Sequence, residues 1–176
     1  MEKRIKSKRV LDGRLIKVDV DQVELCNKKT AIREVVYHNG GVGLLAIKDN
    51  KILLVRQYRY AQQMLTIEIP AGKIEPGEDP YNTGMREIEE ETGYRADHLT
   101  LFTKALPTPG YCSEVLYLYE AHDIKKVDHP LAPDDDEFIN VIEMDIEEAY
   151  QQVLDLKIMD AKTVIAIMYA YNKYIK

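Results

Sequence analysis

The stretch GKIEPGEDPYNTGMREIEEETGY, residues 72–94, carries the strongest local structural signals in the chain. Its first part contains the Gly and Pro residues typical of a loop. Asp79 and Pro80 together predict the start of a helix, with the aspartate as N-cap and the proline at the first helical position. Gly93 predicts where the helix ends. The residues that recur at helical spacing, and so predict the face packed on the core, are Tyr81, Met85, Ile88 and Thr92.

A second face of this helix carries three carboxylates. Glu87, Glu90 and Glu91 stand at positions i, i+3 and i+4, so they share one side, whereas Glu89 falls on a different face. Like charges at these spacings repel one another by roughly a few tenths of a kcal/mol per pair, which a bound cation would offset. Mg²⁺ is usually held by a few carboxylates together with substrate phosphates. The alternative is a solvated acidic face, partly neutralised by Arg86 beside it.

The segments on both sides of this stretch are rich in strands. The apolar alternation of residues 14–25 slips in phase near Asp21 and Gln22, which predicts a strand with a bulge or turn there. With a return strand over residues 30–37 it forms a small antiparallel N-terminal sheet, and Gly40-Gly41 marks a boundary. Further strands are expected at residues 42–47, 51–58, 65–69, 99–105, 115–121 and 138–144, and helices at 146–154 and 161–173. This mixture is typical of an α+β or α/β protein with a mixed sheet. We therefore expect an N-terminal sheet over residues 1–38 and a main domain over residues 39–176.

Composition and charge exclude several classes of protein. The chain has 176 residues, of which 45% are hydrophobic and 31% charged, and this indicates a globular protein without a membrane span. A net charge of −6 lacks the basic footprint of a nucleic-acid-binding protein. We do not expect the charged N-terminus to act as a secretory signal, and Cys26 and Cys112 have no metal-type spacing. We expect a cytoplasmic protein with free thiols that binds neither nucleic acid nor membranes.

The opening stretch resembles the Nudix box, G-x5-E-x7-R-E-U-x-E-E-x-G-U, and fills every fixed position of that pattern. The chain is thus similar to the Nudix hydrolases, which use divalent metal to cleave nucleoside diphosphates linked to another moiety. The resemblance implies the Nudix fold, an α+β fold with a mixed β-sheet sandwiched between helices. It also implies that Glu87, Glu90, Glu91 and the Ala71 carbonyl bind Mg²⁺, or Mn²⁺ in its place. Arg86 resembles the residue that orients the glutamates by ion pairing, and we count Arg86 and Glu91 among the catalytic residues.

Motifs outside the box resemble the ADP-ribose pyrophosphatase subfamily. They are Val55-Arg-Gln-Tyr-Arg59, Glu68-Ile-Pro-Ala-Gly72, Pro109-Gly110, the acidic run at residues 134–137 and Asp160-Ala-Lys-Thr163. The resemblance implies hydrolysis of ADP-ribose to AMP and ribose 5-phosphate by a homodimer built through the N-terminal sheet. The residues that it implies for substrate binding are Arg14, Leu15, Arg33, Glu34, Arg59, Gly110 and Glu114.

The acidic run contains the expected general base. The box glutamates are expected to act as ligands and are then poor proton acceptors, so the base must come from another segment that reaches within about 3 Å of the attacking water. We assign this role to Glu137, with Asp135 or Asp136 as substitutes. Two alternatives stay open. One is hydrolysis of another nucleotide sugar such as GDP-mannose, and the other is a non-catalytic sensor of ADP-ribose, against which the intact glutamates and the lack of a basic DNA-binding module argue.

Overall fold

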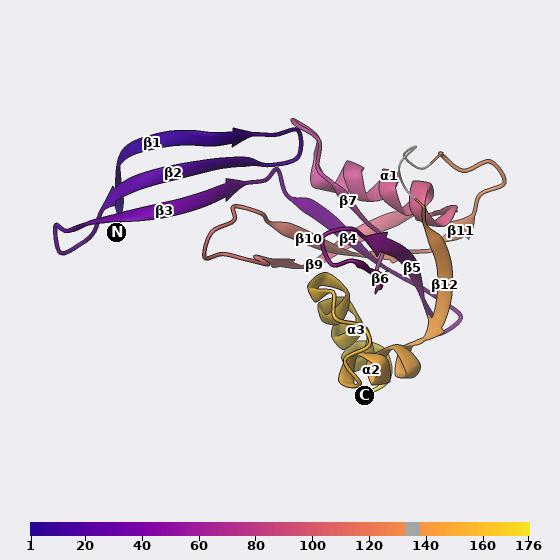
Figure 1. The fold of residues 1–176 in the computed structure, drawn as a ribbon. Helices are drawn as coiled ribbons and strands as arrows, with labels where there is room; N and C mark the ends of the chain where they lie inside the picture. The colour runs from indigo at the N-terminus through magenta and orange to yellow at the C-terminus, as the bar shows by residue number, and fades with distance from the viewer. Residues whose placement is uncertain (133–137) are drawn as a thin grey trace. The chain divides into compact units, whose positions relative to one another are not determined.

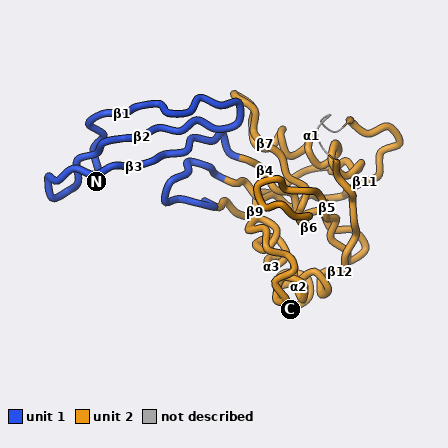
Figure 2. The backbone as a smooth tube through the Cα atoms, in the orientation of Figure 1, with its two compact units in different colours: residues 1–40, 106–115 blue, residues 41–105, 116–176 orange. Residues whose placement is uncertain are grey.

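The structure, a computed structural model, describes residues 1–132 and 138–176. It consists of two compact units (Figure 2). The first contains residues 1–40 and 106–115, and the second contains residues 41–105 and 116–176. The segment 106–115, most of which lies between the strands expected at residues 99–105 and 115–121, thus groups with the N-terminal residues. The division into domains at residue 38 stays a prediction.

The first unit is built on a three-stranded antiparallel sheet in the order β1-β2-β3 (Figure 1). Its strands are β1 (Lys3–Asp12), β2 (Lys17–Glu24) and β3 (Thr30–Tyr37). The sequence does not predict β1, because all of its residues are exposed and follow no burial pattern. The prediction of a bulge near Asp21 in this strand is wrong, because β2 pairs with β3 without a break. The irregularities lie in β1 instead, between Arg4 and Lys6 and between Arg9 and Leu11.

The more buried face of β2 is unexpectedly acidic. Asp19, Asp21 and Val23 are buried on this face, whereas Val18 and Val20 are only half-buried. Arg9 pairs with Asp19, and Arg4 Nη1 lies 3.9 Å from Asp21 Oδ2. The charged side chains of β1 therefore cover carboxylates, which is the reason that a simple apolar alternation does not describe this sheet.

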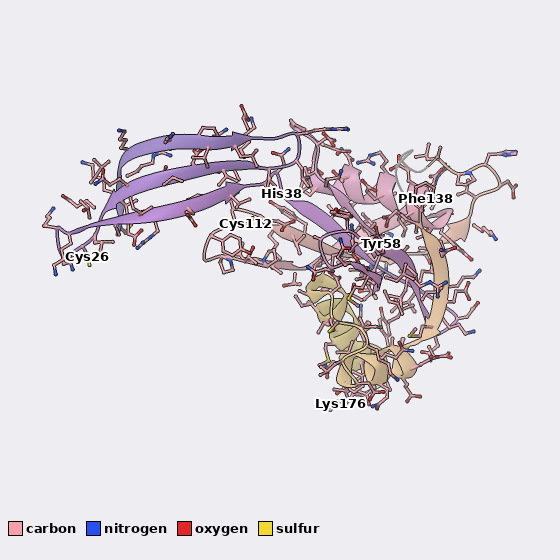
Figure 3. All side chains as sticks on the ribbon, in the orientation of Figure 1. Cys26, His38, Tyr58, Cys112, Phe138 and Lys176 are labelled. Atoms are coloured by element: carbon pink, nitrogen blue, oxygen red, sulfur yellow. The ribbon has the colours of Figure 1, made fainter. Side chains whose placement is uncertain are left out.

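The segment 106–115 lies along β3. Val36 N donates a hydrogen bond to Tyr111 O at 2.7 Å, and Ser113 N donates to Val36 O at 2.9 Å. Cys112 lies in the segment 106–115, and His38, labelled with it in Figure 3, directly follows β3 and donates from its backbone N to Ser113 Oγ at 3.1 Å. Cys26 lies at the hairpin turn between β2 and β3, well away from Cys112. Both cysteines are free.

The second unit contains a mixed sheet in the order β12-β5-β4-β10-β9, with β6 beside β5 and β7 beside β4. It is mixed because β10 runs parallel to β4, whereas the other pairs are antiparallel. The strands of this unit are β4 (Gly41–Lys48), β5 (Lys51–Arg59), β6 (Met64–Glu68), β7 (Ala71–Lys73), β8 (Tyr94–Arg95), β9 (His98–Ala105), β10 (Leu116–His122), β11 (Lys125–Lys126) and β12 (Asn140–Asp145). The helices are α1 (Pro80–Thr92), α2 (Ile146–Leu154) and α3 (Ala161–Tyr174).

The helices cover both faces of this sheet (Figure 1). One core cluster joins the sheet to α1, and the other joins it to α2 and α3. The predicted α+β fold, with a mixed sheet sandwiched between helices and a small N-terminal antiparallel sheet, is confirmed. None of the helices in residues 1–132 and 138–176 has the length and apolar character needed to cross a membrane.

The core face of α1 differs in part from the predicted stripe. Ile88 and Thr92 are buried as expected, but Tyr81 is exposed at the edge of the helix. Gly84 takes part in the contact instead, because a Cβ there would lie 2.7 Å from Leu99 Cδ1. A glycine in the middle of a helix costs about 1 kcal/mol of helix propensity. In this helix it lets α1 approach the sheet closely.

Candidate active site

The helix with the predicted metal ligands, α1, is fixed at both ends. Asp79 Oδ1 accepts a hydrogen bond from Tyr81 N at 2.9 Å, as the N-cap prediction requires. Gly93 ends the helix with a φ of 71°, a conformation that favours glycine. β7 packs against α1, so the loop that connects them folds back and places β7 beside the helix.

Two residues of β7 lie directly against the box carboxylates. A Cβ on Gly72 would lie 1.9 Å from Cδ of Glu87, so only a glycine leaves room for that carboxylate. The neighbouring Ala71 N donates a hydrogen bond to Glu91 Oε2 at 2.7 Å. The structure thus brings Ala71, Glu87 and Glu91, three of the predicted metal ligands, together.

Arg86 connects the remaining acidic groups of the box. Its Nη1 lies 2.9 Å from Glu87 Oε1 and 2.5 Å from Glu90 Oε2. Its Nε lies 3.4 Å from Oε1 of Glu78, the fixed glutamate of the loop. Burial opposes the charged form, but Glu87, Glu78 and Glu90 outweigh it and raise the pKa of Arg86 above its ordinary value. One guanidinium therefore holds three carboxylates in fixed positions.

The donor set suits a hard divalent cation. Glu87 and Glu91 are buried and Glu90 is half-buried, so carboxylate oxygens are concentrated on one side of α1. Oxygen ligands of this kind are those preferred by Mg²⁺ and Mn²⁺. A separate group, Asp97, His98 and Asp123, offers ligand atoms that lie within 4.8 Å of one another, but all three residues are exposed.

A buried ion-pair network beside the box was not anticipated from the sequence. Glu68 at the end of β6 is paired bidentately with Arg59, with both N–O distances at 2.7 Å. Lys162 at the start of α3 donates to the same carboxylate at 2.5 Å. Burial alone would raise the pKa of Glu68, but Arg59, Lys162 and Thr66 hold it at about 2. The signal in the sequence is a lysine, Lys162, in the first turn of a helix whose next turns are apolar.

Glu89 lies on a different face of α1, as the helical spacing predicts, but its carboxylate is buried. Arg95 donates to it from Nε at 2.7 Å and from Nη2 at 3.0 Å. Leu131 N adds a hydrogen bond at 3.3 Å. The hydrogen bond from Arg95 lowers the pKa of Glu89, so this residue anchors β8 and the segment after β11 to the helix.

The other predicted substrate residues belong to the first unit. Arg14, Leu15 and Glu34 are exposed, and Arg33 pairs with Glu2 at 2.5 Å. Gly110 is also exposed, and Glu114 Oε1 lies 3.5 Å from His38 Nδ1. Of the predicted substrate residues, Arg59 alone lies in the unit that contains the box. The roles of all seven stay predictions, and Glu137 lies outside the described residues.

Comparisons with known proteins agree on one family. The NUDIX domain family matches residues 37–166. The chain is 43% identical over 169 residues to the methanol dehydrogenase activator of Bacillus methanolicus. The alignment covers 96% of this chain and 91% of that protein. It is 40% identical over 173 residues to the ADP-ribose pyrophosphatase of Bacillus subtilis (strain 168), covering 98% and 94% of the two chains.

The fold also matches a solved structure. A crystal structure of an ADP compounds hydrolase superimposes with a TM-score of 0.86 and covers 97% of this chain and 92% of that chain. The two sequences are 24% identical, so this match concerns the fold alone.

Proposed function

The chain belongs to the NUDIX domain family, and on that premise we propose that it hydrolyses the diphosphate bond of ADP-ribose to AMP and ribose 5-phosphate. The observation that carries the proposal is the packing of Gly72 and Ala71 against Glu87 and Glu91, with Arg86 holding the neighbouring acids. The choice of ADP-ribose is supported by the pyrophosphatase of Bacillus subtilis, to which the chain is similar over nearly its whole length.

The residues that hold the metal are the Ala71 carbonyl, Glu87, Glu90 and Glu91, with Mg²⁺ or Mn²⁺ as the ion. When bound, a divalent ion supplies charge neutralisation for the diphosphate and lowers the pKa of a water. Arg86 keeps the carboxylates in place through its ion pairs with Glu87 and Glu90.

Two further residues act on the substrate and the water. Arg59 presents a half-exposed guanidinium, whose planar donors suit a diphosphate. Glu137 is the general base that accepts the proton of the attacking water, while the bridging phosphate oxygen leaves with the other product. Phosphoryl transfer needs little beyond such positioning and charge stabilisation.

Residues of the N-terminal sheet and of the segment 106–115 also bind the substrate in this proposal. Arg14, Leu15, Arg33 and Glu34 frame the adenosine as parts of a homodimer, and Gly110 and Glu114 contact the substrate. Neither nucleic acid nor a membrane is a partner. We also place the protein in the cytoplasm, where free thiols such as those of Cys26 and Cys112 stay reduced.

A second candidate function follows from the other relative. The methanol dehydrogenase activator is similar to this chain over the same range and at 43% identity, so activation of a dehydrogenase is a competing role. The name describes an effect on another enzyme and not a bond that is broken. The two roles are therefore separated by measuring hydrolysis of a purified substrate in the absence of any dehydrogenase.

A panel of nucleotide sugars tests the proposal directly. Purified protein is incubated with Mg²⁺ and ADP-ribose, GDP-mannose, other nucleotide sugars or nucleoside triphosphates, and phosphate is measured after coupling to a phosphatase. We expect the highest kcat/KM for ADP-ribose. A higher value for GDP-mannose or for a triphosphate contradicts the substrate assignment and leaves the hydrolase assignment intact. Binding of ADP-ribose without turnover indicates a sensor.

A further inference from the structure

The carboxylate of Glu68 is the meeting point of two cations from distant parts of the second unit. Only 3% of its side chain is exposed. Oε1 accepts hydrogen bonds from Arg59 Nε at 2.7 Å and Thr66 Oγ1 at 2.6 Å. Oε2 accepts from Arg59 Nη2 at 2.7 Å and Lys162 Nζ at 2.5 Å. A carboxylate has about four acceptor positions, and these four bonds fill them.

Lys162 is itself held in place on its other side. Its Nζ lies 3.0 Å from Asp160 Oδ1, and only 10% of its side chain is exposed. Asp160 Oδ2 in turn caps α3 by accepting from Thr163 N at 3.0 Å. Thr163 Oγ1 accepts from Ile69 N at 2.8 Å, directly after Glu68. The ammonium group of Lys162 is therefore held between the start of α3 and the segment from Glu68 to Ala71.

Arg59 is the exposed end of this network. Its side chain is 43% exposed, in contrast to those of Glu68 and Lys162. Nε and Nη2 each give a hydrogen bond to Glu68, and the guanidinium makes no other hydrogen bond within residues 1–132 and 138–176. The hydrogen bonds to Glu68 are the main reason that the pKa of Arg59 is raised, and Asp160 and Glu91 add to the effect. Arg59 thus lies within electrostatic reach of the box glutamate Glu91.

We propose that Lys162 is a positioning residue for Arg59, acting through the carboxylate of Glu68, a role that rests on the proposed contact of Arg59 with the substrate diphosphate. Two cations and two carboxylates, those of Arg59, Lys162, Glu68 and Asp160, balance one another in the network. Without the lysine, Arg59 is the only one of these cations left for two acids. Its guanidinium is then drawn towards them and away from the orientation in which its outer donors face a ligand.

The substitution Lys162→Met tests this role, because methionine keeps the volume of the side chain and removes its charge. We expect KM for ADP-ribose to rise about tenfold, with kcat changed less than about threefold, since a binding contact is weakened rather than a reacting group removed. In an Arg59→Ala background the same substitution should have little further effect on KM. Lys162→Gln, which keeps an N–H donor without the charge, replaces the methionine variant if that variant fails to fold.

Lys173→Met is the matched control. Lys173 lies near the other end of α3 and also pairs with a buried carboxylate, that of Glu120, at 2.7 Å. Its removal breaks an ion pair of the same kind without touching Arg59. We expect a lower Tm for Lys173→Met and an unchanged KM. An equal rise of KM in both lysine variants, or full additivity of Lys162→Met with Arg59→Ala, overturns the positioning role.

A second measurement does not depend on turnover. The Nε–H resonance of Arg59 in ¹⁵N-labelled protein reports on its hydrogen bond to Glu68. We expect it to shift and to exchange faster with water in Lys162→Met, and to stay unchanged in Lys173→Met. If the wild-type protein does not cleave ADP-ribose, the proposed function fails, and this resonance still decides whether Lys162 orients Arg59. An unchanged resonance in Lys162→Met overturns the inference whatever the substrate is.

Discussion

Gly72 lies so close to Glu87 that a single methyl group cannot be added between them. A Cβ at this position would lie 1.9 Å from Cδ and 2.0 Å from Oε1 of the carboxylate. The glycine is needed here for space and not for a left-handed backbone conformation. The backbone of β7, held by its pairing with β4, thus sets the position of a predicted metal ligand.

We predict that Gly72→Ala lowers kcat by about 100-fold or more, because Glu87 must leave its place to admit the methyl group. Gly84→Ala is the control, since its Cβ would meet Leu99 Cδ1 at 2.7 Å and touch no carboxylate among its nearest contacts. Activity assays and thermal melts of both variants separate the two effects. Both should melt at a lower temperature, and equal losses of kcat would show that Gly72 has no special relation to the site.

Replacement of single box glutamates should remove most of the hydrolytic activity. Glu87→Gln and Glu91→Gln should each lose about 100-fold or more in kcat, since a lost ligand disturbs both charge and water activation. Excess EDTA should abolish hydrolysis, and added Mg²⁺ should restore it. Hydrolysis that survives EDTA contradicts the metal assignment.

The sequence pattern offers Glu89→Gln as a nearly neutral control for these variants, because it lies on another face. The structure revises that expectation. Glu89 is buried and accepts hydrogen bonds from Arg95 and from Leu131 N, so its replacement should lower stability. Glu147→Gln, at an exposed position on α2, is the better control.

Glu137 is the subject of a third prediction. Glu137→Gln should lower kcat by about 10²–10⁴ and leave the Kd for ADP-ribose within several-fold, as expected when a proton acceptor is lost and a binding group is kept. Single-turnover rates and equilibrium titrations measure the two quantities separately. A variant with nearly wild-type kcat moves the search for the base to Asp135, Asp136 and Glu114.

Among the secondary-structure elements, β6 and α3 are joined by charge as well as by apolar packing. Glu68 is the last residue of β6, and Lys162 and Thr163 belong to the first turn of α3. An ion pair that is buried in this way is weak evidence for stability by itself, but removal of one partner leaves the other charge buried and is strongly destabilising.

The pKa of Glu68 predicts how this link responds to acid. Its ordinary value is 4.5, and in the folded protein it is about 2. Because the folded value is the lower one, the ionised carboxylate stabilises the protein in full above its ordinary pKa, and this contribution is lost as the pH falls towards 2. Urea unfolding at several pH values should show the free-energy gap between wild type and Glu68→Gln shrinking by roughly 3 kcal/mol over that range. A gap that does not change with pH contradicts the ionised, paired state of Glu68.

On the scale of the whole molecule, the first unit has little core of its own. β1 is exposed along its whole length, and exposed apolar side chains include Leu11, Leu15 and Ile32. A three-stranded sheet needs a hydrophobic face or a packing partner to be stable in water. A second copy of the chain is the commonest solution to that problem.

We therefore predict a homodimer, with a mass in light scattering close to twice the 20.3 kDa of one chain. Deletion of residues 1–38 should abolish both dimerisation and activity, because the proposed substrate residues Arg14, Leu15, Arg33 and Glu34 are lost with the sheet. An active enzyme of about 20 kDa at assay concentration, or an active deletion variant, contradicts this prediction.

Most of the fold could be predicted from local patterns. The caps of α1 at Asp79 and Gly93 are where the sequence places them, and α2 and α3 begin at the expected residues, because caps and amphipathic periodicity are properties of neighbouring residues. β1 and the short strands β7, β8 and β11 could not be predicted in this way. Their residues follow no alternation that a hydrophobic pattern would reveal.

The spacing of Gly72, Glu78 and the glutamates of one helix is enough to identify the family from the amino-acid sequence. It also determined which face of α1 carries them, because 3.6 residues per turn place Glu87, Glu90 and Glu91 together whatever surrounds the helix. Which charges are buried, and which partners they have, depends on the packing of distant segments. Glu68 and Lys162 are 94 positions apart, so neither reveals the other along the chain. A charge can leave water only where a partner of opposite charge is brought to it, and that meeting is a consequence of the completed fold.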